Sequence, residues 1–201
     1  STRSGPERHF TGADLFDLAI ASDPQISPDG RYIAYVRQSN DIMSDRAIGS
    51  IWLIDTRTGR ETPLAGRNGD AFNPRWSPSG DRLAYVSTEG GGPQLWVQWI
   101  EGGNAVRLTG LPTSPSSMAW SPDGQSIAYT MLVKDDGPKL GSAPSDKPEG
   151  ADWAEPLEIR DLLTYRADGQ GYLEPGFDKI FVVPSTGGAP RQLTFGRFHD
   201  G

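Results

Sequence analysis

The sequence predicts an all-β fold of WD-like β-propeller blades, on the basis of a repeat, its spacing and its turn chemistry. A phrase of the type Ser-Pro-Asp/Ser-Gly, followed by an apolar run, begins at Ser27, Ser77 and Ser121. The steps between these serines are 50 and 44 residues, close to the roughly 40–50 residues of a four-stranded blade. The chain is therefore predicted to hold about three blades, which form an incomplete ring.

The repeated phrase predicts a hairpin between the first two strands of each blade. Proline presets φ in the turn, the short polar residues bond nearby backbone, and glycine accepts a positive φ. The apolar residue before each turn (Ile26, Trp76 or Trp120) ends one strand, and an Ile/Leu-Ala-Tyr run begins the next. This run is apolar on both faces, as expected for a strand covered by neighbouring blades.

A second recurring segment predicts the two outer strands of each blade. Apolar runs at 51–54, 95–99 and 180–183 each lead through a glycine-bearing turn to a short strand. Trp52 and Trp96 are 44 residues apart, whereas Trp96 and Phe181 are 85 apart. The third blade is therefore predicted to carry an insertion of about one blade's length.

These patterns divide the chain into an N-terminal arm and a partial propeller. Thr11 and Asp14 resemble the start of a capping box, and the apolar residues after them predict a short helix beside the propeller. The expected boundaries are 1–22 for the arm and helix, 23–201 for the propeller, 23–66, 67–110 and 111–195 for the blades, and about 132–178 for the insertion.

Composition limits the classes of partner. The formal net charge of −7 disfavours binding to nucleic acid. No run approaches the roughly 20 apolar residues that span a bilayer, so we expect a soluble protein without a membrane partner. The chain has no cysteine, and its acidic residues lack the spacing of metal ligands, so neither disulfides nor a cofactor or metal is predicted.

The residues of the insertion and the last blade carry a family resemblance. The runs 165–173, 180–184 and 190–194 resemble the propeller of bacterial acylaminoacyl-peptidase-like members of the prolyl oligopeptidase family, and the resemblance covers almost the whole chain. It implies a serine peptidase of two domains, with an N-terminal propeller over a C-terminal α/β-hydrolase domain that holds a Ser-Asp-His triad. It also implies peptide substrates, in the cytoplasm or periplasm of a bacterium.

The chain departs from this family pattern because it lacks the hydrolase. It has no Gly-x-Ser-x-Gly elbow, and its two histidines, His9 and His199, lie near the two ends. No catalytic residue is therefore assigned. Three blades cannot close a ring, so we expect a fragment whose remaining blades and α/β-hydrolase domain belong to the same parent protein, including as a separate chain.

The insertion supplies the candidate substrate-binding residues. Glu155 and Glu158 would share one face of a helix, and dipeptidyl-peptidase-like relatives use acidic residues from a propeller insertion to hold the free amino terminus of a substrate. A solvated acidic face is the alternative. Trp153 lies outside the repeat and is a candidate for a substrate pocket.

Two arginines are candidates for binding a substrate carboxylate. The guanidinium groups of Arg160 and Arg166 match the geometry of a carboxylate. The alternative is pairing with the neighbouring Asp161 or Asp168 at a blade edge. The other tryptophans occupy repeat positions or adjacent ones and are expected in the core.

Two functions remain from the sequence. The first is a propeller that gates and selects short peptides for a serine peptidase. The second is a non-catalytic propeller of the TolB type that binds a protein partner. The insertion, with its Tyr-Arg-Ala-Asp-Gly run at 165–169, favours the first because a plain scaffold would not need it.

Overall fold

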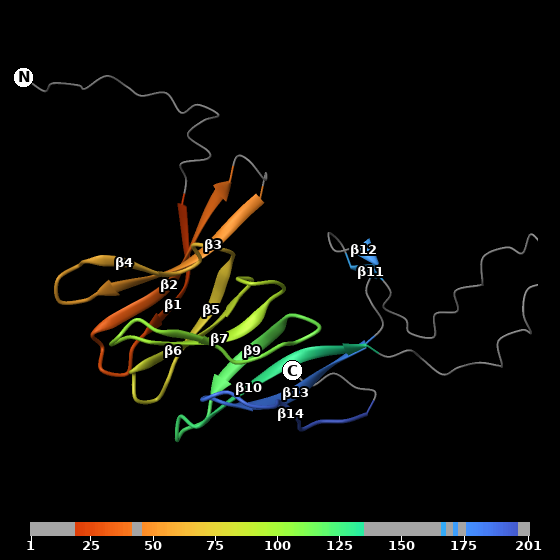
Figure 1. Cartoon of the computed structure of the whole chain (residues 1–201). Coiled ribbons are helices and arrows are strands. Elements are labelled where there is room, and N and C mark those ends of the chain that lie inside the picture. The colour runs from red at the N-terminus through yellow and green to blue at the C-terminus, as the bar shows by residue number, and fades with distance from the viewer. Residues whose placement is uncertain (1–18, 42–45, 135–165, 168–170, 173–175, 197–201) are drawn as a thin grey trace, which may run out of the picture.

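The structure, a computed structural model, describes residues 19–41, 46–134, 166–167, 171–172 and 176–196. Three four-stranded antiparallel sheets and a two-stranded hairpin make up the fold (Figure 1). The first sheet holds β1 (Ala19–Ile26), β2 (Tyr32–Asp41), β3 (Arg46–Asp55) and β4 (Glu61–Ala65). The second holds β5 (Ala71–Trp76), β6 (Arg82–Ser87), β7 (Gln94–Trp99) and β8 (Ala105–Arg107). The third holds β9 (Pro115–Trp120), β10 (Ser126–Lys134), β13 (Gly176–Pro184) and β14 (Arg191–Gln192).

This arrangement confirms the predicted fold class. Each sheet contains one copy of the repeat, and the three sheets do not form a closed ring. The strands of each sheet pair in chain order, with an intervening segment between β10 and β13 in the third. The described residues contain no helix. The small hairpin of β11 (Arg166–Ala167) and β12 (Gly171–Tyr172) lies between β10 and β13 in sequence.

Two of the expected boundaries change. The predicted helix before the first blade does not extend over Ala19–Ser22, because these residues form the start of β1 and pair with Val36–Ser39 of β2; the rest of that prediction lies outside the described residues. The pairing of β10 with β13 continues to Lys134 and Gly176. Residues 132–134 and 176–178, expected in the insertion, are therefore part of the third sheet.

A Ser-Pro-x-Gly turn closes the first hairpin of each sheet. In the first sheet the Gly30 N–H donates to the Ser27 carbonyl at 2.8 Å. The Ser27 hydroxyl donates to the Asp29 carboxylate at 2.6 Å and accepts from the Tyr32 N–H at 2.9 Å. The buried serine thus satisfies both the turn and the beginning of the next strand, which explains its place in the repeat.

The other two turns use the same bonds with one change. Ser121 donates to Asp123 in the third sheet as Ser27 does in the first. In the second sheet Ser79 replaces the aspartate, and Asp81 accepts from Ser77 instead, at 2.9 Å. A carboxylate therefore holds the serine hydroxyl in every turn, and this serine is buried in the first two sheets and half-buried in the third.

These carboxylates predict an acid-sensitive fold. Donating serine hydroxyls are the main cause that holds the pKa of three aspartates below the ordinary 3.8: Asp29 through Ser27, Asp81 through Ser79 and Asp123 through Ser121. A lowered folded-state pKa stabilises the fold above pH 3.8, and this stabilisation is lost as the pH falls through the folded pKa. We expect the urea concentration at the midpoint of unfolding to decrease when the pH is lowered below about 4. Changing all three aspartates to asparagine should make this decrease smaller. Glu101→Gln, on the exposed turn after β7, is the control and should leave the decrease unchanged. An equally small decrease in the Glu101→Gln variant would contradict the role given to the three aspartates.

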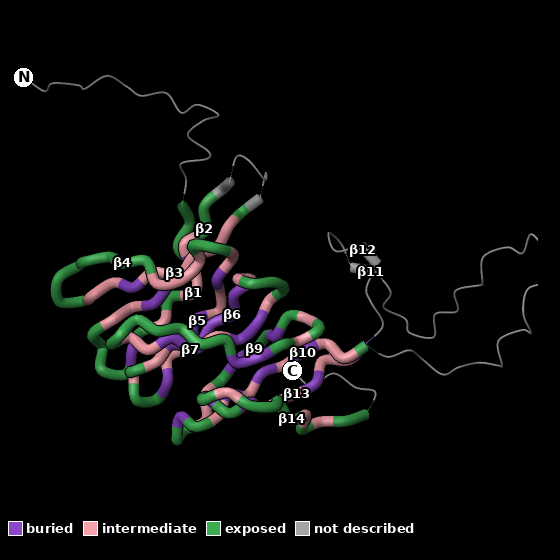
Figure 2. Tube along the Cα trace, in the orientation of Figure 1, coloured by how far each residue is buried: buried purple, intermediate pink, exposed green. Residues whose placement is uncertain are grey.

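The core lies between consecutive sheets (Figure 2). β6 is buried on both faces: Leu83 and Tyr85 pack toward the first sheet, and Ala84 and Val86 pack toward the third. From the third sheet Tyr129 enters the second of these interfaces, and burial raises its pKa to about 12. The prediction that this strand is covered on both faces is confirmed for the second sheet.

Glycine in the turn serves the packing of the sheets as well as the turn. Gly80 has φ +74°, and a Cβ at this position would lie 3.2 Å from Cδ of Pro28 in the turn of the first sheet. Gly30, its counterpart in the first sheet, has φ +71° and nothing within 4 Å. Gly30 and Gly80 therefore share the left-handed backbone conformation, but only Gly80 lies close to a neighbouring turn.

This pair separates backbone strain from crowding. Gly30→Ala is expected to lower the free energy of unfolding by about 1–2 kcal/mol through the left-handed conformation alone. Gly80→Ala is expected to lower it further, because its methyl group also displaces Pro28. Urea unfolding of both variants measures the difference, and equal losses would show that the turns are not in close contact.

Candidate functional site

The candidate substrate-binding residues from the sequence analysis come after β10 and before β13 in the sequence. Arg166 is in β11, where its backbone pairs with Tyr172, and its side chain is not described. The other four fall outside the described residues: Trp153, Glu155, Glu158 and Arg160. Their roles therefore stay predictions.

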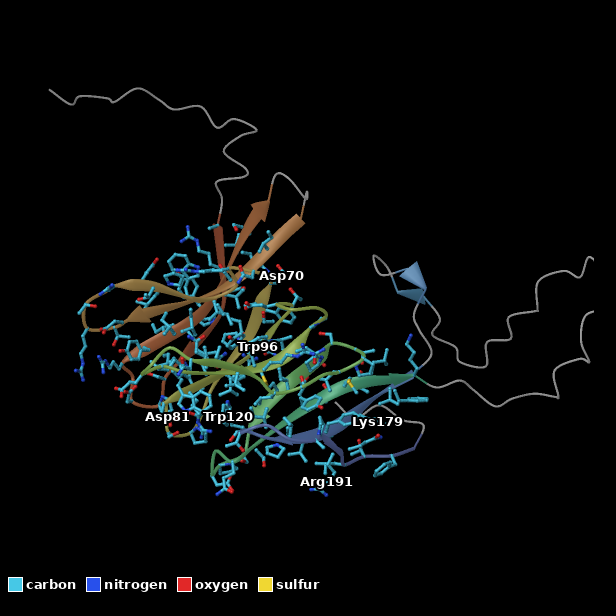
Figure 3. The ribbon with its side chains drawn as sticks, viewed as in Figure 1. Asp70, Asp81, Trp96, Trp120, Lys179 and Arg191 are labelled. Carbon is cyan, nitrogen blue, oxygen red and sulfur yellow. The ribbon has the colours of Figure 1, made fainter. Side chains whose placement is uncertain are left out.

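A hollow lies beside the strands that lead into and out of this segment. Its volume is about 280 Å³. Lys179 is 3% exposed, and its ammonium group lies 5.6 Å from the centre of the Phe177 ring. Figure 3 places Lys179 on the third sheet, toward the end from which the segment leaves. The hollow thus combines apolar walls with positive charge; it is lined by Val133, Lys134, Phe177, Lys179, Gln192, Phe195 and Gly196.

A second candidate lies on the innermost strands of the sheets, β1, β5 and β9, which contact one another in that order. Each strand carries a bulge with one polar residue in the left-handed region: Asp23 at φ 46°, Asn73 at φ 57° and Ser117 at φ 43°. This conformation is unfavourable for residues other than glycine, although asparagine and aspartate tolerate it best. Innermost strands surround the central channel of a propeller.

An ion pair joins two of these strands. Nη1 of Arg75 donates to both carboxylate oxygens of Asp23, at 2.8 and 3.1 Å, and Gln25 donates to the same carboxylate at 2.8 Å. Both charged side chains are 32% exposed. The pair therefore holds the first and second sheets together while part of each charge faces solvent. A guanidinium can bind a peptide carboxylate, and a carboxylate can accept from a peptide amine.

Sequence reasoning missed this inner edge, although the repeat contains a signal for it. Asp23-Pro24 and Asn73-Pro74 are 50 residues apart, the same step as the one between Ser27 and Ser77. An acidic or amide residue before proline at a constant place in the repeat indicates a fixed backbone role. The pattern could have marked the bulge before the structure was known.

The histidine that a serine–histidine pair would need is absent from the described residues. His9 and His199 both lie outside the described ranges. No cluster of three or more potential metal-ligating side chains occurs in the part of the chain that the structure describes. Among the same residues, no helix has the length and hydrophobicity needed to span a membrane.

Comparison with known proteins connects this fold with peptidases. The model of the TolB beta propeller domain family matches residues 17–137. Over 187 residues the chain is 33% identical to the uncharacterized peptidase YuxL of Bacillus subtilis (strain 168), an alignment that covers 92% of this chain and 28% of that protein. The resemblance to peptidase propellers predicted from the sequence is thereby confirmed.

Solved structures show the same fold. The acylaminoacyl peptidase of Pyrococcus horikoshii superposes with a TM-score of 0.67 at 18% identity, over 89% of this chain and 25% of that one. A TolB protein from Agrobacterium tumefaciens superposes with a TM-score of 0.52 at 17% identity, over 87% of this chain and 48% of that one. The chain thus spans about a quarter of the length of the two peptidases.

Proposed function

Because the chain belongs to the TolB beta propeller domain family, we propose that it is part of the propeller of a larger serine peptidase. In this proposal the propeller gates and selects short peptides for an α/β-hydrolase domain outside the chain. Further blades and the hydrolase domain belong to the same parent protein.

The observation that carries the proposal is the sequence identity between this chain and the peptidase YuxL. A value of 33% that extends over 92% of the chain includes the region between β10 and β13 as well as the three repeats. The repeats alone would also fit a TolB scaffold, and the TolB protein shares the fold. The alternative is therefore a non-catalytic propeller that binds a protein partner.

The inner edge gives the proposed selection a physical basis. A peptide that passes along the centre of a propeller meets its innermost strands, where Asp23 and Arg75 present opposite charges that are part exposed. Such charges interact with the termini of a short peptide. A folded protein would not fit between the blades.

The parent protein tests the proposal directly. We expect it to hydrolyse peptides of a few residues, to leave folded proteins intact, and to react with a fluorophosphonate at a serine outside residues 1–201. Deleting residues 19–196 should abolish this discrimination by size if the hydrolase stays folded, which its reaction with the fluorophosphonate reports. A protein that neither hydrolyses peptides nor reacts would overturn the peptidase proposal and favour the scaffold.

The two glutamates of the segment between β10 and β13 have their own test. If Glu155 and Glu158 anchor a substrate amine, Glu155→Gln with Glu158→Gln should raise KM for peptides with a free amino terminus several-fold by removing the charge partner. KM for acetylated peptides, the matched control, should stay unchanged. If the variant and the unaltered enzyme had equal KM values for peptides with a free amino terminus, the two glutamates would belong to a solvated surface.

A further inference from the structure

A buried glutamine of the second sheet organises a set of hydrogen bonds. Oε1 of Gln94 accepts from the Thr109 hydroxyl at 2.9 Å and from the Leu111 N–H at 2.7 Å. Nε2 of the same side chain donates to the Leu111 carbonyl at 3.0 Å. Gln94 is 4% exposed, so its amide has hydrogen-bond partners at both ends in place of water. We call these three residues the corner of the second sheet.

The third sheet contains an equivalent corner. The Leu95 N–H donates to the Thr109 hydroxyl at 3.0 Å, and the Ile180 N–H donates to the Thr194 hydroxyl at 2.9 Å. The carbonyl of each threonine also accepts a hydrogen bond from the side chain two residues before it. These matching bonds show that Thr109 and Thr194 occupy equivalent positions.

The third sheet lacks the acceptor of this corner. By the same register, Lys179 takes the position of Gln94, and Gly196 takes that of Leu111. A lysine side chain has donors and no acceptor. The Thr194 hydroxyl and the Gly196 N–H therefore donate to no acceptor among the described residues. In the second sheet the two corresponding donors share a single oxygen atom.

The hollow of about 280 Å³ described above lies at this corner, because Lys179 and Gly196 both belong to its lining. The rings of Phe177 and Phe195 add apolar walls, and Lys134 adds a second cation. The described residues that line the hollow include no carboxylate. The hollow therefore combines hydrogen-bond donors and positive charge with apolar surface.

A carboxylate has the atoms that the corner lacks. One of its oxygens would take the place of the Gln94 amide oxygen and accept from the Thr194 hydroxyl and the Gly196 N–H. The other would accept from the Lys179 ammonium, whose three N–H groups can serve a ligand and a protein partner together. Hydrogen bonds between ionised groups are also stronger than those between neutral groups. An apolar group on the same ligand would contact the walls of the hollow.

We propose that this hollow binds a carboxylate attached to an apolar group, such as the C-terminal end of a peptide or a small organic acid. Lys179 supplies the charge, and the donors of Thr194 and Gly196 fix the position of one oxygen. This proposal goes beyond the proposed function, because it requires neither peptide hydrolysis nor a hydrolase domain. The two proposals can therefore fail separately.

Calorimetric titration of the full chain tests the ligand class. N-acetyl-phenylalanine carries the ring and the carboxylate, and its amide is the matched ligand without the charge. We expect the acid to bind at least about tenfold more tightly than the amide. Inorganic phosphate, which has no apolar group, should bind more weakly than the acid.

Two further ligands identify the source of the carboxylate. Phenylacetate has no peptide bond, whereas Gly-Gly-Phe has the end of a peptide chain. Tighter binding of Gly-Gly-Phe would support the site and assign it to peptide C-termini. Binding of phenylacetate at equal or higher affinity would support the site and assign it to small organic acids.

One substitution gives the third sheet the residue that the second sheet has. Lys179→Gln removes the charge and supplies an amide oxygen that can accept from Thr194 and Gly196. We expect this variant to fold and to bind the acid at least about tenfold more weakly. Lys179→Met should also lose binding, and its urea midpoint should lie below that of Lys179→Gln because methionine supplies no comparable acceptor.

Arg191→Gln is the control for charge alone. Arg191 lies in β14 of the same sheet, outside the lining of the hollow, and Figure 3 labels it with Lys179. This variant should bind the acid as the unaltered chain does. An equal loss of binding in Arg191→Gln would assign the effect to the general charge of the sheet and overturn the site.

Three other results would overturn the proposal. The first is equal affinity of the unaltered chain for the acid and its amide. The second is unchanged affinity for the acid in the Lys179→Gln variant. The third is binding of inorganic phosphate as tight as that of the acid, which would show a charge effect only. If Lys179→Gln does not fold, the comparison of acid, amide and phosphate on the unaltered chain still decides.

Discussion

Replacing Leu95 by alanine is expected to lower the free energy of unfolding of the full chain by about 2–5 kcal/mol. Leu95 is fully buried in the cluster between the second and third sheets, where it packs with Val97, Met118 and Tyr129. Its loss removes apolar burial and leaves a cavity that the surrounding strands fill only in part. Urea unfolding followed by circular dichroism measures the change.

The matched control is the same truncation in the next sheet. Ile180 occupies the position equivalent to Leu95, opposite Thr130 as Leu95 is opposite Val86, but it is part exposed. Ile180→Ala should cost less than half as much, because part of its side chain is already in contact with water in the folded chain. Equal losses would contradict the assignment of the core to the interfaces between sheets.

The repeat made the sheets predictable because each blade is built from local interactions. The turn bonds of Ser27, to Asp29, Gly30 and Tyr32, span at most five residues, so their chemistry is visible in a short window of sequence. The prediction also placed Trp76 and Trp120 in the core by their repeat positions. Their more specific role, an indole hydrogen bond to the preceding sheet, spans 51 and 45 residues respectively. No local pattern contains a bond of that length.

The candidate site was harder to predict for the same reason. Asp23 and Arg75 are 52 residues apart in sequence, and the fold alone brings them into contact. The start of the first strand was also misassigned. Leu15, Phe16, Leu18 and Ala19 fit helical spacing, whereas in the structure Ala19 pairs with Ser39 of β2. Tertiary pairing overrides a short amphipathic pattern.

Removing the indole donor should have different effects at Trp120, which ends β9, and at Trp96, which lies in β7. Trp120→Phe deletes the 2.9 Å bond to the Arg75 carbonyl and weakens the contact with the Arg82 guanidinium, so we expect a loss of about 1–3 kcal/mol in the free energy of unfolding. Figure 3 labels both Trp120 and Trp96 in their sheets. Trp96 is the control, because its Nε1 is buried without a hydrogen-bond partner among the described residues.

Trp96→Phe should change the free energy of unfolding by less than about 1 kcal/mol, since the lost ring area is offset by removal of an unsatisfied buried donor. Urea unfolding of both variants gives the comparison. If the two variants lost equal stability, ring size would account for both, and the indole bond would not hold the sheets together. A larger loss for Trp120→Phe would show that the indole hydrogen bond and the guanidinium contact stabilise the packing of the third sheet on the second, beyond the apolar area that both tryptophans bury.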